Sequence, residues 1–269
     1  MSSQSSSQST LVSANSLEIG YKDRHKVHSI AKNINFEVQT GELVAIIGVN
    51  GSGKSTLLKS LSGQLNTLKG KININQTSLS QIDHKELGTL LSLVLTNEPV
   101  SKQLSVLEMV ALGRHPYTNW LGHLTTQDHK IIENALVQVD LFQKKDKICD
   151  ALSDGQFQKV LIARALAQDT PLILMDEPTT HLDMFHKVYV LKLLKSIIKN
   201  SSKSILFASH EINLALQLCD KIILINHEKV ECGTPSELVS KGAFNTLFPE
   251  DYITFDEDSR TFRMKVEKD

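Results

Sequence analysis

The chain alternates between short apolar runs and segments in which apolar residues recur with helical spacing. Residues 43–47 are apolar at every position, which is typical of a strand buried on both faces. Residues 33–38 alternate apolar with polar side chains, which predicts a half-buried strand. The same reasoning predicts further strands at 70–75, 90–95, 172–175, 204–208 and 222–225, and helices at 54–65, 156–167, 185–198 and from 211 onward.

Strands that alternate with helices predict an α/β fold, in which helices cover both faces of a mainly parallel sheet. Residues 97–150 depart from this alternation. Ser105 and Glu108 have the spacing of a capping box that opens one helix. Thr125 begins a second helix, whose apolar stripe starts at Ile132. We therefore expect a helical insertion at about 97–150.

Composition narrows the class of protein. The 269 residues suffice for one or two domains with a real core, and 41% hydrophobic with 22% charged residues is ordinary for a globular protein. Lys+Arg 29 against Asp+Glu 30 gives a net charge of −1, so no nucleic-acid partner is indicated. The cysteines lie far apart and include no CxxC pair, which indicates reduced thiols in a cytosolic protein.

The two ends of the chain are predicted to be tails around a main domain at 15–248. Residues 1–14 are rich in Ser and Gln and lack both a basic region and an apolar stretch, so we expect disorder rather than a signal peptide. Residues 249–269 contain two apolar stretches around a polar turn, which predicts a hairpin. Every apolar run is shorter than the roughly 18 residues that cross a bilayer, so any pore is expected in another subunit.

A glycine-rich segment between a buried strand and a helix predicts a phosphate-binding loop. Backbone N–H groups of such a loop, with the helix N-terminus, surround phosphate oxygens. A chance Gly/Ser turn is the alternative, but the strand before it and the helix after it favour the loop. We expect Lys54 to reach the β- and γ-phosphates of a nucleotide and Ser55 to offer a hydroxyl to Mg²⁺. The predicted ATP site comprises Gly48, Val49, Asn50, Gly51, Ser52, Gly53, Lys54, Ser55 and Thr56.

Two adjacent acids end the strand predicted at 172–175. Asp176 is placed to hold Mg²⁺ through water, and Glu177 is placed to orient or deprotonate an attacking water. Paired acids at a strand end can also simply cap the next helix. The phosphate loop in the same chain favours the catalytic interpretation.

The segment Leu152-Ser153-Asp154-Gly155-Gln156 predicts a second anion site, because it opens a helix whose N-terminus favours negative charge. The chain already has a phosphate loop of its own. The second site therefore needs a phosphate from another molecule, which predicts a dimer that closes on ATP.

In order and spacing, these motifs resemble the ATP-binding subunits of ABC transporters, from about Leu17 to Phe248. The resemblance implies a P-loop NTPase core with an antiparallel β layer at its N-terminal side and an inserted helical subdomain. It implies that two copies sandwich ATP and Mg²⁺, and that Ser153, Asp154, Gly155 and Gln156 face the ATP of the partner. It also implies a separate membrane permease, a substrate-binding protein acting indirectly, and a peripheral place on the cytoplasmic face of the inner (plasma) membrane.

The resemblance assigns roles to further residues. Tyr21, ahead of the first predicted strands, would stack on adenine, and His210 would touch the γ-phosphate as a switch histidine. Glu177 would be the catalytic carboxylate. The loop that crosses the dimer interface would contain Thr180, His181, Leu182 and Asp183.

Two positions depart from the family's pattern. Asp154 replaces a glycine, and we expect its carboxylate to point away from the phosphate and to favour the helix N-terminus. Thr96 stands where relatives place a glutamine on Mg²⁺. Either water bridges the shorter side chain to the metal or Asn97 substitutes, so we expect weaker metal coordination there.

The segments 110–116 and 120–122 resemble importer ATPases for iron chelates, which serve siderophore, haem and cobalamin uptake. A helix stopped by Gly113 and Pro116 is the purely structural alternative. The histidines show no metal-ligand spacing, so this chain is not expected to touch iron.

Three other functions would share some of these motifs. A soluble ABC ATPase acting on nucleic acid or ribosomes would usually carry two cassettes or a coiled-coil insertion, and would show salt-dependent nucleic-acid binding. A small-molecule kinase would share the phosphate loop but would not use the second anion site. An exporter cassette is commonly fused to its membrane domain.

Overall fold

A six-stranded sheet forms the centre of the computed structural model, which describes residues 9–22, 26–95, 101–226, 229–245, 247–248, 253–257 and 259–264. The strand order is β10-β9-β3-β8-β7-β6, and every neighbouring pair is parallel except the antiparallel pair β9 and β10. These strands are β3 (Leu43–Gly48), β6 (Leu91–Leu95), β7 (Leu172–Asp176), β8 (Ser204–Ser209), β9 (Lys221–Asn226) and β10 (Lys229–Gly233).

The strand sequences supply two cores, one on each face of this sheet. In β3, Leu43, Ala45 and Ile47 join the core on one face, and Val44 and Ile46 join the core on the other. Successive side chains of a strand point to opposite faces, so a continuous apolar run buries both. The prediction of doubly covered strands is confirmed.

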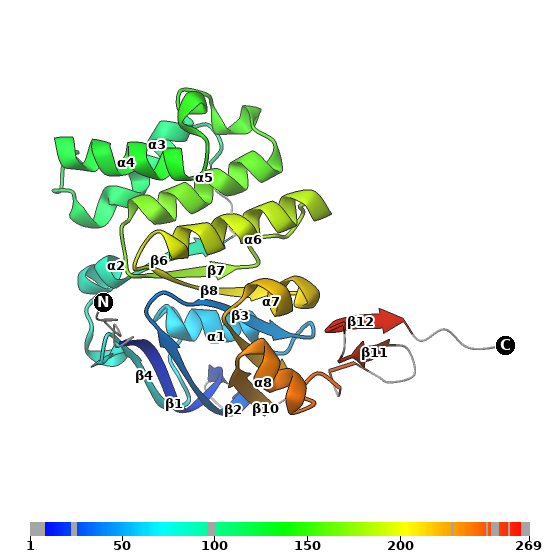
Figure 1. Cartoon of the computed structure of the whole chain (residues 1–269). Coiled ribbons are helices and arrows are strands. Elements are labelled where there is room, and N and C mark those ends of the chain that lie inside the picture. Colours follow the sequence, from blue (N-terminus) through cyan, green and yellow to red (C-terminus); the bar gives the residue numbers. More distant parts are fainter. Residues whose placement is uncertain are drawn as a thin grey trace, which may run out of the picture.

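A second sheet of four strands, in the order β2-β1-β4-β5, covers one face. Its pairs are antiparallel, which confirms the expected β layer, and α1 (Lys54–Leu61) lies between the two sheets (Figure 1). One side of α1 packs Leu57, Leu58 and Leu61 into this core. The strands are β1 (Thr10–Lys22), β2 (Val27–Gln39), β4 (Lys69–Ile74) and β5 (Thr77–Ser78).

Two expectations for this layer were wrong. Residues 10–14 were assigned to a disordered tail, but they begin β1, because Leu11, Val12 and Ala14 are buried against the layer's core. Tyr21 was placed ahead of the first strands, but it lies inside β1, paired with His28. Residues 1–8 lie outside the described part of the chain.

Helices cover the other face of the central sheet, with α5 and α6 stacked above it in Figure 1. This face is covered by α5 (Asp154–Ala167), α6 (Met184–Lys199), α7 (Ile212–Leu218) and α8 (Pro235–Ser240). The sequence did not predict α8, nor the short α2 (His84–Leu90) that leads into β6. Each is under two turns long, so neither shows a repeating apolar stripe.

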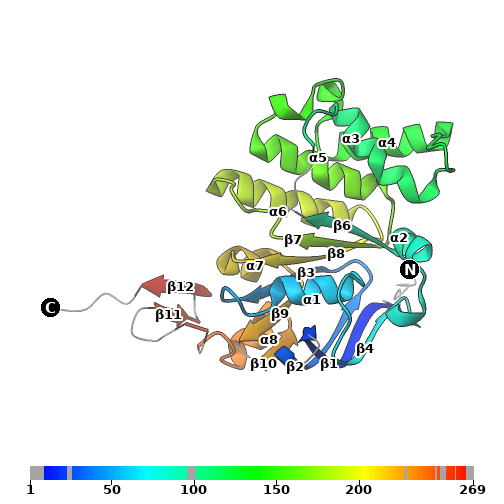
Figure 2. The same cartoon turned by 180° about the vertical axis from the view of Figure 1, so that it is seen from behind.

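The expected helical insertion forms a further layer on α5 (Figure 2). It contains α3 (Val106–Ala111) and α4 (Thr126–Gln138). The predicted capping box at Ser105 is present, and a second capping box, which the sequence analysis did not predict, lies at Thr125. The first of these helices does not continue as an α-helix beyond Ala111. Instead it changes at Leu112 into a 3₁₀ segment that ends at Tyr117.

A buried ion pair fastens this layer together. The Arg114 Nε atom donates to Asp128 Oδ1 at 2.7 Å, and its Nη1 atom donates to the Ala167 carbonyl at 2.8 Å. Hydrogen bonds from the Thr125 hydroxyl and amide, helped by Arg114, hold the pKa of Asp128 at about 2 against the opposing effect of burial. The guanidinium also lies 4.0 Å from the centroid of the Tyr117 ring.

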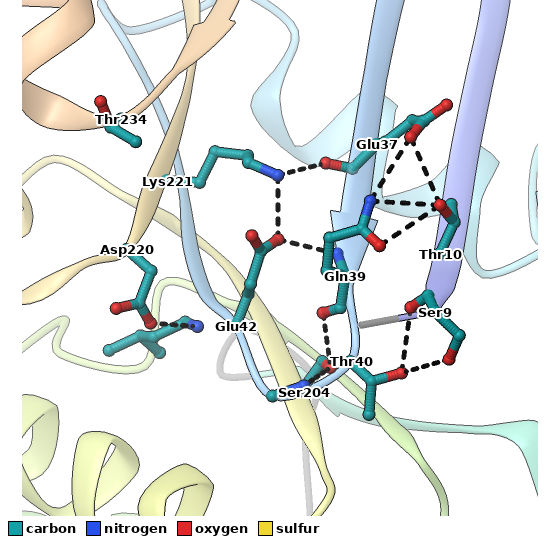
Figure 3. Close-up of polar contacts among 12 residues, drawn as sticks. Ser9, Thr10, Glu37, Gln39, Thr40, Glu42, Ser204, Asp220, Lys221 and Thr234 are labelled. Atoms are coloured by element: carbon teal, nitrogen blue, oxygen red, sulfur yellow. Dashed lines mark hydrogen bonds and ion pairs between the residues drawn. The ribbon is translucent and has the colours of Figure 1, made fainter. Parts of the chain in front are cut away.

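At the amino ends of the central strands, polar contacts join the two sheets (Figure 3). The Lys221 ammonium donates to the Glu37 carbonyl at 2.7 Å and to Glu42 Oε2 at 3.0 Å. The same carboxylate accepts from the Gln39 amide at 2.8 Å, and the Gly41 amide donates to Ser204 Oγ at 2.9 Å. These bonds fix the turn between β2 and β3, and therefore the direction in which β3 enters the sheet.

The last described strands, β11 (Ile253–Asp256) and β12 (Thr261–Met264), pair antiparallel at the place where the sequence predicted a hairpin. Phe255 and Phe262 lie 5.0 Å apart between ring centroids and pack against Phe244. Among the described residues, no helix is long and apolar enough to span a membrane.

Replacing Arg114 with methionine is expected to lower the free energy of unfolding by about 3–5 kcal/mol, because Asp128 stays buried without its cation. Urea denaturation at neutral pH measures this loss. Lys69 is the matched control, since it pairs with Glu18 while its own side chain is 77% exposed. Lys69→Met should cost less than about 1 kcal/mol. Similar losses in both variants would contradict the importance of the buried pair.

Candidate functional site

Three neighbouring parallel strands bring the predicted site residues to one edge of the sheet. In the order β3-β8-β7, Ile47 pairs with Ser209, and Ala208 pairs with Asp176. The chain therefore leaves these strands at the same level: into the phosphate loop, towards His210, and into Glu177. Ligands of open α/β sheets bind at the carboxyl ends of such strands.

The phosphate loop closes around the side chain of its own lysine. Lys54 Nζ donates to the carbonyls of Gly48 at 3.0 Å and Val49 at 3.1 Å. Gly53, with φ +105°, stands at the N-terminus of α1, where a Cβ atom would lie 2.6 Å from Ile30 Cγ2. Burial lowers the pKa of Lys54, although the nearby Glu177 and Asp176 partly oppose the shift. An anion beside this ammonium would stabilise its charge.

Ser55 and Asp176 form a pair of oxygen donors beside the loop. Ser55 Oγ donates to Asp176 Oδ1 at 3.1 Å. Burial raises the pKa of Asp176; the Ser55 hydrogen bond opposes this rise, and the charge of Glu177 adds to it. A cation at this position would favour the ionised carboxylate. Within the described ranges no three His, Cys, Asp or Glu side chains cluster as a metal site. A metal here would need phosphate and water as its other ligands, which suits Mg²⁺.

Glu177 is held in an uncommon backbone conformation, with φ +52°. Its amide donates to the Ala208 carbonyl at 3.2 Å. Its Oε1 atom lies 2.5 Å from His210 Nε2, and its Oε2 atom accepts from the Thr180 hydroxyl at 2.9 Å. The sequence placed Thr180 only in the interface loop and missed this contact. No local pattern in the sequence indicates this contact, because it depends on the left-handed backbone at Glu177.

The phosphate loop, the acid and the histidine share one cavity of about 330 Å³. Tyr21 is 44% exposed and lies close by, with its hydroxyl 3.4 Å from Thr56 Oγ1. Thr96 and Asn97 lie outside the described residues. The cavity is lined by Asn50, Gly51, Gly53, Lys54, Ser55, Thr56, Glu177 and His210.

The second predicted anion site lies elsewhere, since none of Ser153, Asp154, Gly155 and Gln156 lines this cavity. Ser153 Oγ accepts from the Gln156 amide at the N-terminus of α5. Asp154 points into solvent, with its side chain 76% exposed and 3.9 Å from Lys102. One chain therefore does not bring the two phosphate sites together.

The predicted interface loop lies next to this second site. His181 has φ +64°, and Asp183 caps α6 by accepting from the His186 amide at 2.8 Å. The His186 ring also bonds to Asp183 and covers Gly155, where an added Cβ would lie 2.7 Å from its Cδ2 atom. The His186 imidazole, in the first turn of α6, thus links Asp183 at the end of the loop to the first turn of α5.

Comparison with known proteins identifies the family. A family model described as ABC transporter matches residues 31–180. The chain belongs to the ATP-binding subunits of ABC transporters. Subunits of this family bind ATP and hydrolyse it to power transport, so the predictions of family, fold and ATPase activity are confirmed.

Individual relatives and solved structures resemble the chain over most of its length. The iron(3+)-hydroxamate import ATP-binding protein FhuC of Bacillus subtilis is 32% identical, over 89% of this chain and 88% of its own. An inward-facing ABC transporter of metal-chelate type has a chain that is 28% identical, with a TM-score of 0.77 and 89% of each chain covered. A dimeric ATP-binding cassette with bound ADP and Pi is 28% identical, with a TM-score of 0.69. The match covers 82% of this chain and 98% of the cassette.

Gly155→Ala is expected to lower the free energy of unfolding by about 1–3 kcal/mol, because its methyl group would overlap the His186 ring. In a His186→Ala background the same substitution should cost less than about 1 kcal/mol, since the ring is gone. Urea denaturation of the four proteins gives the coupling between the two positions. Gly88→Ala is the control, because its Cβ would meet Pro116 at an ordinary 3.4 Å. Additive effects of the two substitutions would show that the ring does not restrict residue 155.

Proposed function

We propose that the chain is the ATP-hydrolysing subunit of an importer for iron chelates, working as a pair of identical subunits beneath a separate membrane permease. The main support for this proposal is that the predicted phosphate-binding groups lie at two separate places on one chain. Lys54, Asp176 and Glu177 meet at one strand edge, whereas Ser153 stands at a helix N-terminus outside that cavity. A second copy can supply what each cavity lacks.

The phosphate loop holds the nucleotide in this proposal. Lys54 exchanges its bonds to the Gly48 and Val49 carbonyls for the β- and γ-phosphate oxygens of ATP. The amides from Asn50 to Thr56 surround the phosphates at the N-terminus of α1. The Tyr21 ring, close to Thr56, stacks on adenine.

Mg²⁺ would be held by Ser55 directly and by Asp176 through water, and when bound it would neutralise charge on the phosphates. Glu177 orients the attacking water and accepts its proton. His210, bonded to the same carboxylate, reaches the γ-phosphate from the end of β8. These side chains stand at the start of α1 and at the carboxyl ends of the neighbouring strands β7 and β8, so the site depends on the register of the sheet.

The second copy completes the site. Its Ser153, Gly155 and Gln156 face the γ-phosphate at the start of α5, and its loop from His181 to Asp183 crosses the interface. The dimeric cassette described above supports this arrangement by its likeness. The relatives named for iron(3+)-hydroxamate and metal-chelate transport support the substrate class. The pair would lie on the cytoplasmic face of the membrane, with a substrate-binding protein acting through the permease.

Glu177→Gln is expected to abolish steady-state ATP turnover while leaving ATP binding intact, because an amide cannot accept the proton of water. The variant should then accumulate as an ATP-bound dimer. Release of phosphate measures turnover, and size-exclusion chromatography with and without ATP measures the dimer. Lys187→Gln, which removes the cation from a pair with Glu211 at the start of α7, is a control that should retain turnover. Normal turnover in Glu177→Gln would place the base elsewhere.

Asp154→Gly restores the family's usual residue and is expected to change turnover by less than about fivefold, because an exposed ion pair contributes about 1 kcal/mol or less. The Asp154 side chain is 76% exposed, and its Oδ1 atom lies 3.9 Å from Lys102 Nζ. Phosphate release at saturating ATP, compared with Lys102→Gln, measures the effect. An increase of many fold would mean that the carboxylate repels the partner's ATP.

A further inference from the structure

Glu177 is oriented by two side chains, of which only His210 comes from a neighbouring strand. The other is Thr180, whose hydroxyl donates to Oε2 at 2.9 Å. Each carboxylate oxygen therefore has one side-chain partner among the described residues. A carboxylate fixed at both oxygens keeps one plane, and that plane decides where a bound water can lie.

The turn between Glu177 and Thr180 is also closed by the backbone. The Thr180 amide donates to the Glu177 carbonyl at 3.1 Å, and the Leu182 amide donates to the Thr179 carbonyl at 3.3 Å. Glu177, at the start of this turn, and His181, directly after it, have left-handed φ values of 52° and 64°. Residues other than glycine rarely adopt this backbone conformation unless surrounding bonds hold them in it.

Thr180 is the first residue of the predicted interface loop, which runs to Asp183, and Asp183 is fixed as the cap of α6. The hydroxyl of Thr180 is thus the first group through which a displacement of the loop would reach the carboxylate. His210 directly follows β8, on a segment of the chain separate from the loop.

We propose that Thr180 is a positioning residue for ATP hydrolysis: its hydroxyl sets the orientation of the Glu177 carboxylate and makes that orientation depend on the interface loop. This inference rests on the proposed function, because it takes Glu177 as the group that orients the water. Thr180 does not line the cavity that contains the phosphate loop, so it acts through Glu177 and not on the nucleotide.

The experiment compares steady-state ATP hydrolysis by the full-length wild type and the Thr180→Val, Thr180→Ser and Thr179→Val variants. Valine keeps the shape of threonine and removes the hydroxyl, whereas serine keeps the hydroxyl. Thr180→Val should lower kcat by about 10- to 100-fold, since small misplacements of a catalytic group have effects of this size. The KM for ATP should stay within about twofold of the wild type, because nucleotide binding is untouched.

Thr180→Ser should restore kcat to within about threefold of the wild type, because a serine hydroxyl can make the same bond. Thr179→Val is the matched control: Thr179 is buried one residue away, and its variant should keep the kcat and KM of the wild type. Thermal melting of each protein checks that the fold is intact. A purely structural role for Thr180 would lower melting temperature and kcat in the valine and serine variants alike.

The inference is overturned if Thr180→Val keeps wild-type kcat, if serine fails to rescue it, or if Thr179→Val loses as much activity. In each of those cases an inactive Glu177→Gln variant leaves the proposed function standing. Failure of the wild type to hydrolyse ATP, or full turnover in Glu177→Gln, would remove the proposed function and this inference with it.

Discussion

The site depends on the position of β8 between β3 and β7 in a parallel sheet. Because all three strands run in the same direction, their carboxyl ends deliver the phosphate loop, His210 and the acids to one edge. The register sets the depth of each group: Ala208 stands beside Asp176, and Glu177 then bonds to the Ala208 carbonyl. A shift of one residue in β7 would turn Asp176 to the other face of the sheet and separate it from Ser55.

Much of this edge could be predicted from the sequence, because its signals are local. An apolar strand followed by glycines and a lysine, or by two acids, encodes its own structure over about ten residues. Leu11 and Val12 were misread because the serines around them resemble a disordered tail, and only pairing with β2 and β4 buries them. The contacts of Thr180 with Glu177 and of His186 with Gly155 could not be predicted, since each depends on a left-handed turn or on packing between helices.

Polar bonds also tie the strands together at their amino ends. Lys221 and Glu42 join the turn before β3 to the start of β9, and Ser204 receives the amide of Gly41. These polar bonds are part-buried, and the one between Lys221 and Glu42 joins two charged groups. They fix the end of β3 opposite to the phosphate loop. Polar groups at the opposite end of β3 thus hold the strand that leads into the phosphate loop.

The turn after β7 contains Glu177 and has a strained backbone. Glu177 and His181 each adopt a left-handed conformation that costs of the order of 1–3 kcal/mol and persists only where bonds over-determine it. Here those bonds come from His210, Thr180 and the cap at Asp183. From Glu177 to His186 the chain passes from the carboxylate to the ring that covers Gly155. Under the proposed function, a second copy contacts this segment. That contact would displace both Glu177, which orients the water, and the start of α5, which faces the ATP held by the second copy. The arrangement gives a physical reason why hydrolysis and dimer closure would be linked: both depend on one short turn that cannot change its shape at one end alone.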